Sequence, residues 1–336
     1  MCSSDLVTLT PAPVLDRTYL VDSFAEGKVN RSSEVHEYMS GKGLNVARTL
    51  HLARIQVAGI IPIGREDEHL LFRTPFPQIL RIVPIAGRVR VNTAIVDRGG
   101  NTTNVNQTAI PMSQSDWRRV CELAIEQVEE VDADWLVVSG VHPTTIEDGS
   151  YVDLEPLFEA IRARGTRIAL DTSGSPLDRW AKSGLVNLIK PNADELANLV
   201  GRNLYTIADA LEAGREMNAQ GIEVALVSLG ADGALAVTAD EAHWGRAVAT
   251  EVVNTTGAGD ATLAGFLAHS IVDGPRPRGV PADLTLPDAL GYACSWGALA
   301  VSLPTTLISS FADAPYPKVS EPEPDRPLGE RTHLLT

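Results

Sequence analysis

The sequence predicts an α/β fold in which helices flank a mainly parallel central sheet, with a small β element beside it. From about residue 135 onward, short apolar runs alternate with helix-like stretches, which is the pattern of a parallel sheet covered by helices. The N-terminal third instead carries β-like pieces separated by turns, such as residues 17–21 and 89–96. With 336 residues, 44% of them hydrophobic, the chain is long enough to bury a large core.

Four candidate strands of the central sheet end in polar or glycine-rich residues. The strands are residues 135–138, 167–170, 186–189 and 224–227. The segments that follow them are residues 139–140, 171–174, 190–192 and 228–230. Ligands of open α/β sheets bind beyond the carboxyl ends of the strands, so we expect these four endings to line one crevice.

The bulk composition excludes several classes of function. The formal net charge of -15 argues against a general nucleic-acid binder, because phosphate backbones are held by surplus Lys and Arg. Three cysteines without CxxC spacing suggest neither a disulfide framework nor a zinc cluster. The chain does not open on a basic segment followed by an apolar stretch, and no run approaches the roughly 18 apolar residues that span a bilayer. We therefore expect a cytoplasmic protein that binds neither nucleic acid nor membrane.

The most informative motif is Thr255-Thr-Gly-Ala-Gly-Asp-Ala-Thr262, which follows a strand-like run at residues 249–253. Apolar residues recur at helical spacing after it, so its glycines are expected at the N-terminus of a helix. Backbone N–H groups are unpaired there and the helix dipole is positive, which favours a bound anion. Asp260 would lie within reach of a phosphate held by this loop.

The residues of this motif leave two other interpretations open. One is a plain glycine-rich turn in which Asp260 only favours the helix dipole. The other is a dinucleotide fingerprint, but that motif needs a third glycine where this chain has Thr262, and it lies early in a βαβ unit rather than near the C-terminus.

A second motif, Ser40-Gly-Lys-Gly-Leu-Asn-Val-Ala47, places a flexible Gly-Lys-Gly at the start of a helix. It is not a Walker A loop, which requires Ser or Thr after the Lys. Lys42 could deliver a point charge to a phosphate, and Asn45 could bind sugar hydroxyls. A plain glycine turn is the alternative for this motif.

The two motifs, in this order, resemble the two signatures of the PfkB/ribokinase family of carbohydrate kinases. The resemblance runs from about residue 7 to residue 307, and within the family it is greatest to the branch that contains 1-phosphofructokinase and tagatose-6-phosphate kinase. Further matching segments lie in the expected order, namely residues 16–19, 29–31, 90–92, 139–140, 171–174, 190–192 and 228–230.

The resemblance implies a Rossmann-like ribokinase fold with a small β-sheet lid, a sugar bound between lid and main domain, and ATP beside the Gly257 loop. We expect a single α/β kinase domain over residues 6–312, with a discontinuous β lid from about 14–38 and 86–108, through which a homodimer could form. Residues 313–336 are rich in Pro and Glu and too poor in apolar residues to pack by themselves, so we expect a tail there.

Site roles follow from the resemblance residue by residue. Asp260 is the implied catalytic base, with Gly257, Ala258 and Gly259 forming the anion hole beside it. The implied substrate-binding residues, with Lys42 and Arg90 on the existing sugar phosphate, are Asp16, Gly41, Lys42, Asn45, Arg90, Asn92 and Ser139. The implied ATP-binding residues, among which Cys294 stands where an Asn often lies near the adenine, are Lys190, Ser228, Gly230, Gly233, Thr256, Gly257, Gly259 and Cys294.

Asn192 and Glu195 are implied by the resemblance to organise hydrated Mg²⁺. An Asn followed three residues later by a Glu also makes a capping arrangement at a helix N-terminus, and the residues alone favour that interpretation. The two roles are compatible. Arg90 likewise has an ordinary alternative as a solvated strand residue. Asp171 could be a substrate-side polar group, and a turn residue that closes a strand is the alternative.

The implied function is ATP-dependent phosphorylation of a ketohexose monophosphate, with fructose 1-phosphate, which would yield fructose 1,6-bisphosphate, as the favoured substrate. Alternatives are a tagatose-6-phosphate or fructose-6-phosphate kinase, another sugar or nucleoside kinase of this fold, and a sugar-phosphate sensor without turnover. Lys42 and Arg90 argue against an unphosphorylated substrate, and Asp260 argues for catalysis. The incomplete glycine fingerprint disfavours a nicotinamide-dependent oxidoreductase.

Overall fold

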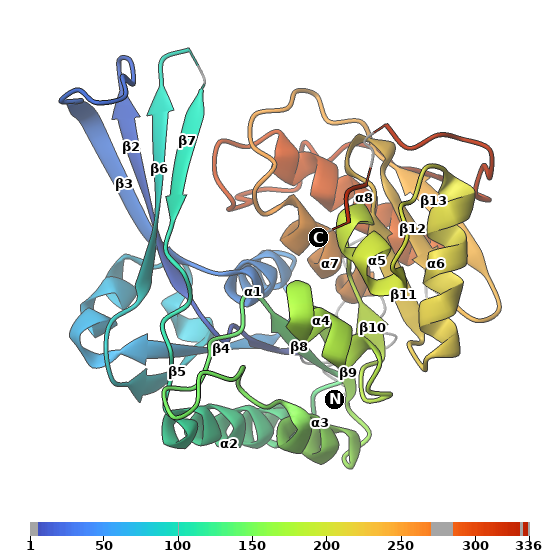
Figure 1. Ribbon diagram of the computed structural model, residues 1–336, viewed down its shortest axis with the longest axis horizontal. Coiled ribbons are helices and arrows are strands. Elements are labelled where there is room, and N and C mark those ends of the chain that lie inside the picture. Colours follow the sequence, from blue (N-terminus) through green and yellow to red (C-terminus); the bar gives the residue numbers. More distant parts are fainter. Residues whose placement is uncertain (1–5, 100, 270–284, 330–331, 335–336) are drawn as a thin grey trace.

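The predicted α/β fold is confirmed by a computed structural model, which describes residues 6–99, 101–269, 285–329 and 332–334 (Figure 1). The expectation about the first residues of the chain therefore lies outside the described part. The described strands form a ten-stranded main sheet and a separate four-stranded sheet, here called the small sheet. No described helix is long and apolar enough to cross a membrane.

The main sheet has the order β14-β13-β12-β11-β10-β9-β8-β1-β4-β5. Neighbours from β11 to β5 pair in parallel, whereas β12, β13 and β14 add an antiparallel edge. The strands are β1 Leu6–Leu9, β4 Val57–Gly64, β5 Leu80–Ile85, β8 Trp135–Ser139, β9 Arg167–Asp171, β10 Leu188–Ile189, β11 Val224–Ser228, β12 Ala234–Val237, β13 Ala242–Arg246 and β14 Lys318–Ser320. The parallel strands are apolar along nearly their whole length because both faces are covered.

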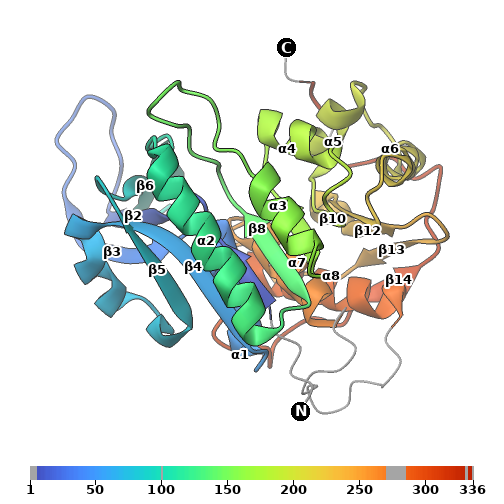
Figure 2. The same cartoon turned by 90° about the horizontal axis from the view of Figure 1, so that it is seen from below.

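Helices cover both faces of the main sheet (Figure 2). One face carries α2 Gln114–Val131, α3 Glu155–Arg162, α4 Gly174–Ala181, α5 Ala193–Val200 and α6 Ile207–Ala219, whose apolar sides form one core cluster. The other face carries α1 Lys42–Leu52, α7 Ala258–His269 and α8 Leu286–Val301, which form the second cluster. Since the chain leaves β1 toward β4 on one side and returns to β8 on the other, the switch point of the sheet lies at β1 and β8, where ligands of such sheets bind.

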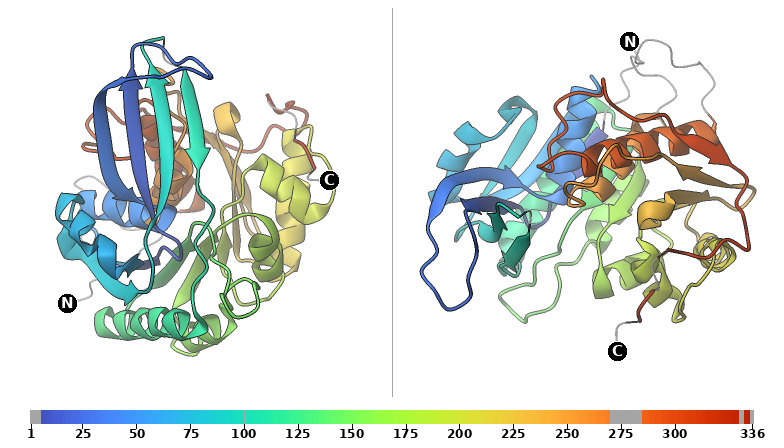
Figure 3. Two further views of the ribbon diagram at one scale, coloured as in Figure 1. Left: turned by 60° about the vertical axis from the view of Figure 1, so that its left-hand side comes forward. Right: turned by 90° about the horizontal axis from the view of Figure 1, so that it is seen from above.

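The small sheet stands away from the main body beside this switch point (Figure 1, left; Figure 3, left). Its order is β3-β2-β6-β7, with the strands β2 Val14–Val21, β3 Ser32–Ser40, β6 Arg90–Asp97 and β7 Thr102–Asn106. The register of β2 and β6 places Val14 opposite Arg90 and Asp16 opposite Asn92. β3 runs directly into α1, so residues 40–42 join the small sheet to a helix that covers the main sheet.

Residues 249–253, predicted as a strand, are not one. β13 ends at Arg246, and residues 247–257 reach α7 without pairing in either sheet. The N–H groups of Val253 and Asn254 both donate to the carbonyl of Val301 at the end of α8. The β-branched residues of this run have no neighbouring strand to pack on, and Val252 is 74% exposed.

The described residues after 312 lie on the domain rather than apart from it. β14 adds to the edge of the main sheet by pairing with β13, and later residues reach as far as Asp194 at the start of α5. A few apolar side chains of this segment, Ala314, Val319 and Leu328, pack against the core. Backbone hydrogen bonds to the domain also hold it, a kind of contact that composition does not reveal.

Candidate active site

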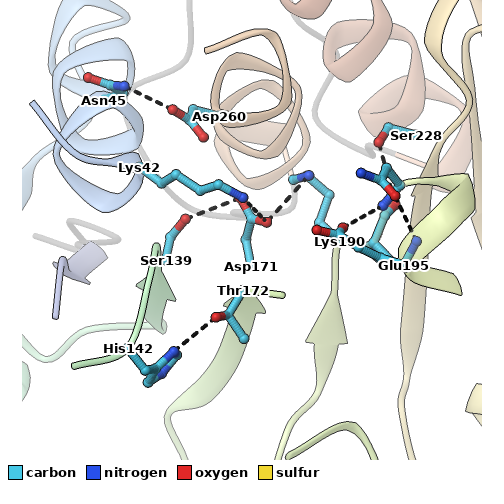
Figure 4. A network of polar contacts seen from close by, with 12 residues as sticks. Lys42, Asn45, Ser139, His142, Asp171, Thr172, Lys190, Glu195, Ser228 and Asp260 are labelled. Carbon is cyan, nitrogen blue, oxygen red and sulfur yellow. Dashed lines mark hydrogen bonds and ion pairs between the residues drawn. The ribbon is translucent and has the colours of Figure 1, made fainter. Parts of the chain in front are cut away.

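Asp171 lies at the carboxyl end of β9, in the region beyond the strand ends that is here called the crevice, and its side chain is fully buried (Figure 4). Its Oδ1 is 3.1 Å from Lys42 Nζ and 3.5 Å from Lys190 Nζ, and its Oδ2 accepts a hydrogen bond from Ser139 at 3.2 Å. Burial by itself raises the pKa of this carboxyl, but the charges of Lys190 and Lys42 outweigh burial and hold the pKa below its ordinary value. Asp171 is therefore a permanent negative charge that fixes two lysines.

Asp260 is another buried carboxylate, in the first turn of α7. The side-chain amide of Asn45 donates to its Oδ2 at 2.9 Å, which joins α1 to α7 (Figure 4). Burial raises the pKa of Asp260 to about 6, against the opposing effects of the Lys42 charge and the Asn45 hydrogen bond. A carboxylate with such a pKa is suited to take up a proton near neutral pH.

Lys42 connects the two carboxylates electrostatically. Its pKa is raised chiefly by Asp171, with further contributions from Asp260 and Glu195, so it remains an ammonium ion. Its side chain is 41% exposed and therefore also accessible from the crevice. Lys42 thus interacts with both Asp171 and the candidate base Asp260. Its predicted role on the sugar phosphate did not imply this arrangement.

Glycines bring the backbone close to the site at two points. At Gly41, between β3 and α1, φ is 140°, and an added Cβ would lie 2.6 Å from Thr10 Cγ2 at the end of β1. At Gly257, just before α7, φ is 84°, and an added Cβ would lie 2.9 Å from Thr306 Cβ. Ala258 begins α7, and its own N–H donates to the carbonyl of Thr255 at 3.3 Å. The first-turn N–H groups lack intrahelical acceptors, which makes a helix end of this kind favourable for an anion.

Lys190 reaches the same helix end. A Cβ added to Gly259 would lie 3.0 Å from Lys190 Nζ, so the ammonium group rests against the first turn of α7. Lys42, Lys190 and the N-terminus of α7 thus converge on one region that carries positive charge on both sides of Asp171. An anionic group such as a transferred phosphoryl group would be stabilised there.

The substrate-side residues of the small sheet form a separate cluster. Asn92 donates to Asp16 Oδ1 at 3.2 Å, and Arg90 donates to the carbonyl of Ala12 at 3.4 Å. Burial raises the pKa of Asp16, while hydrogen bonds from Ser40 and Asn92 and the charge of Arg90 oppose the rise. The Ser40 hydroxyl oxygen also lies 3.5 Å from Asn45 Oδ1, so polar side chains lead from the small sheet to Asp260.

Asn192 and Glu195 form the predicted capping arrangement at α5. Glu195 N–H donates to Asn192 Oδ1 at 2.8 Å, and Asn192 N–H donates to Glu195 Oε2 at 2.9 Å. Within the described residues, no group of three or more His, Cys, Asp or Glu side chains could hold a metal ion. The two capping oxygens nevertheless suit Mg²⁺, which keeps several of its waters and needs only one or two protein carboxylates beside substrate phosphates.

The residues predicted on the nucleotide side surround the turn between β11 and β12. Ser228 ends β11 and donates to the carbonyl of Pro191 at 3.4 Å, and Gly230 opens a 3₁₀ turn, η3 Gly230–Asp232, that Gly233 closes with φ of 91°. Thr256 N–H donates to Asn254 Oδ1 at 2.9 Å in the approach to α7. The Cys294 thiol is buried in α8 against Gly245 of β13, and burial raises its pKa to about 12, opposed by a hydrogen bond with the backbone of Ala234, which follows Gly233.

Two features of the site escaped sequence reasoning. The sequence predicts Asp171 only as a turn or substrate-side residue, whereas it is the ion-pair partner of both lysines. A carboxylate that directly follows a buried strand, at the same sheet edge as Ser139 and Lys190, was the available signal. The second feature is that Asn45, predicted on sugar hydroxyls, is hydrogen-bonded to Asp260.

The fold and the crevice define an enzyme of the phosphoryl-transfer class: a buried carboxylate with a raised pKa lies beside two ammonium groups and an anion-binding helix end. The chain matches the model of the pfkB family carbohydrate kinases over residues 11–310. It belongs to this family, and it is an ATP-dependent sugar kinase.

Known proteins agree with this assignment. A 1-phosphofructokinase of Haloferax volcanii is 35% identical over 280 residues, which cover 81% of this chain and 87% of the relative. A 1-phosphofructokinase of Bacillus subtilis is 29% identical over 78% of this chain and 84% of its own length. Among solved structures, phosphofructokinase-2 from Escherichia coli in complex with potassium has a TM-score of 0.78 at 25% identity, covering 93% of this chain and 97% of that one.

Proposed function

We propose that this kinase transfers the γ-phosphoryl group of ATP to the free 6-hydroxyl of fructose 1-phosphate, giving fructose 1,6-bisphosphate. The observation that carries the proposal is Asp260, a buried carboxylate with a pKa of about 6 that Asn45 holds at the N-terminus of α7. The substrate is proposed because the curated relatives at 28–35% identity bear the name 1-phosphofructokinase.

The residues divide the reaction between them. Asp260 accepts the proton of the attacking hydroxyl, and the N–H groups of residues 257–260 hold the charge that develops on the transferred phosphoryl group. Lys190 lies against this helix end and adds positive charge. Phosphoryl transfer has a loose transition state, so positioning and charge neutralisation supply most of the catalysis.

The sugar is proposed to lie between the small sheet and the crevice. Asp16 and Asn92 would bind its hydroxyls together with Ser139, and Arg90 and Lys42 would bind its phosphate. The two cations stand on different elements, since Arg90 opens β6 and Lys42 opens α1. A phosphate held between them would tie the small sheet to the main domain and exclude water from Asp260.

The nucleotide is proposed to lie along Ser228, Gly230 and Gly233 toward α7, with Cys294 on the adenine side. Asn192 and Glu195 would hold hydrated Mg²⁺, which when bound neutralises charge on ATP oxygens. We place the enzyme in the cytoplasm, where the free thiols Cys121 and Cys294 would stay reduced.

A homodimer through the small sheet is part of the proposal. The sheet carries exposed apolar side chains, among them Val35 on β3 and Val105 on β7. Sedimentation velocity tests this idea: Val105→Glu is expected to yield monomers, and a wild-type chain that sediments as a monomer at all concentrations would contradict it.

An ATP-to-ADP assay over several acceptors tests the proposed reaction. The panel contains fructose 1-phosphate, fructose 6-phosphate, tagatose 6-phosphate, ribose and adenosine. We expect the highest kcat/KM with fructose 1-phosphate. Activity on ribose or adenosine alone would refute the proposed substrate class, and binding of sugar phosphates without any ADP would indicate a sensor.

A further inference from the structure

The C-terminal segment, residues 318–329 and 332–333, is here called the C-terminal strap. It lies wholly beyond residue 310, where the match to the carbohydrate kinase family ends. It begins as β14 on the edge of the main sheet and continues past the start of α6 to the start of α5 (Figure 3, right).

Backbone hydrogen bonds fasten the strap to the start of α6. The carbonyls of Pro324 and Arg326 accept from the N–H groups of Ala208 and Ile207, at 3.0 and 2.9 Å. These donors belong to the first turn of α6, where no intrahelical acceptor exists. Leu328 N–H donates to the carbonyl of Tyr205 at 2.8 Å, so the strap follows this segment as an added extended chain.

A side-chain cluster fastens the strap to the η3 turn, residues 230–232, where the nucleotide is proposed to bind. Gly329 N–H donates to Asp232 Oδ2 at 2.6 Å, and Arg326 lies 3.8 Å from Asp232 Oδ1. The Arg326 guanidinium also stacks over the Trp244 ring, 4.8 Å from its centroid, while Trp244 Nε1 donates to the carbonyl of Asp232 at 2.8 Å. The side chain of Asp232 is therefore held by Gly329 and Arg326, and its carbonyl by Trp244. Asp232 lies between Gly230 and Gly233 in the sequence.

A second attachment lies at the start of α5. His333 N–H donates to Asp194 Oδ1 at 2.8 Å, and Asp194 directly precedes Glu195. Thr332 is buried, and its hydroxyl accepts from Leu204 N–H at 2.7 Å. The strap thus contacts the two elements that flank the proposed ATP site, the η3 turn and the N-terminus of α5.

We propose that the C-terminal strap is a positioning element of the ATP site, which holds residues 230–233 and the first turn of α5 in the arrangement that binds nucleotide. This inference rests on the proposed nucleotide site. A turn that contains two glycines has a large conformational freedom to lose on binding. External anchors at Asp232 remove that freedom beforehand, which strengthens nucleotide binding without a direct contact.

Deletion of residues 322–336 tests the proposal, because it keeps β14 and removes the contacts with Asp232, Asp194 and the start of α6. We expect the KM for ATP to rise roughly 10-fold, with the KM for the sugar phosphate within about twofold of wild type. Hydrogen exchange should accelerate in residues 228–234 and 192–197, with residues 90–97 of the small sheet unchanged.

A point variant keeps the test decisive if the deletion impairs folding. Arg326→Met should raise the KM for ATP roughly 3- to 10-fold. Its matched control is Arg179→Met, because Arg179 also stacks over a tryptophan, Trp180, at 4.4 Å and pairs with an aspartate, Asp153, at 2.9 Å, but on α4. The control should leave both KM values unchanged.

The outcomes separate this inference from the proposed function. An unchanged KM for ATP in both strap variants, or equal rises for ATP and sugar phosphate, would overturn the positioning role. If the wild-type chain turned over no acceptor of the panel, the proposed function would fail, while hydrogen exchange of the free protein would still report whether the strap orders residues 228–234.

Discussion

The two sides of the crevice are built differently. On the main-sheet side, Asp171, Lys190 and Asp260 are buried; Asp171 pairs with Lys190, and Asp260 accepts a hydrogen bond from Asn45. On the small-sheet side, every residue of β6 is only partly buried and every residue of β7 is exposed. The difference teaches that the residues proposed for phosphoryl transfer are held in place by buried contacts within the protein, whereas the strands of the small sheet, where the sugar is proposed to bind, are more open to solvent.

The largest expected loss of stability comes from removing the buried carboxylate of Asp171. Asp171→Ala leaves Lys190 buried without its partner carboxylate, so the free energy of unfolding should fall by about 3 to 5 kcal/mol. Chemical denaturation measures it. The matched change is Asp22→Ala, just beyond β2 of the small sheet, which removes the exposed pair with Arg98 and should cost at most about 1 kcal/mol. Equal losses in the two variants would erase the contrast between the two sides.

Arg90→Met tests whether the small sheet binds the phosphate of the sugar. Loss of a charge-assisted hydrogen bond to phosphate costs on the order of 1.5 to 3 kcal/mol, so the KM for the sugar phosphate should rise roughly 10- to 150-fold with the KM for ATP unchanged. Lys42→Met should raise the same KM and in addition lower kcat, because Lys42 also pairs with Asp171. Parallel loss of ATP and sugar affinity in Arg90→Met would show that Arg90 does not bind the sugar phosphate.

Asn45→Ala tests the link between the two sides. Its hydrogen bond lowers the pKa of Asp260, so its removal should raise that pKa above about 6. A base is lost as pH falls through its pKa, and the acidic limb of kcat/KM should therefore move to higher pH by roughly 0.4 to 1 unit. Thr49→Val, which removes a hydrogen bond to the backbone carbonyl of Asn45, is the control and should leave the limb in place.

Much of the main-sheet side was predictable from sequence, because helix starts and strand ends have local signals. The helices after Gly41 and Gly257 and the cap at Asn192 follow from neighbouring residues. The pairing of Asp171 with Lys42 joins residues 129 positions apart, and no local pattern encodes it. Residues 249–253 look like a strand because β propensity is a local property, whereas strand formation needs a free neighbour.

The smallest effect concerns the α5 cap. Asn192→Ala should lower the free energy of unfolding by about 1 kcal/mol and raise the Mg²⁺ concentration needed for half-maximal activity. Thr206→Ala removes the equivalent cap of α6 and should cost similar stability without changing the Mg²⁺ requirement. If both variants shift the Mg²⁺ requirement equally, Asn192 is only a cap.

The central claim is that Asp260 is the catalytic base, and kcat of Asp260→Asn with fructose 1-phosphate tests it most directly. Asn keeps the size of the side chain and caps a helix almost as well as Asp, so folding and ATP affinity should stay close to wild type. Proton acceptance by a positioned side chain contributes about 10² to 10⁴-fold, and kcat should fall by at least the lower figure. A kcat within a few-fold of wild type would remove Asp260 from the mechanism.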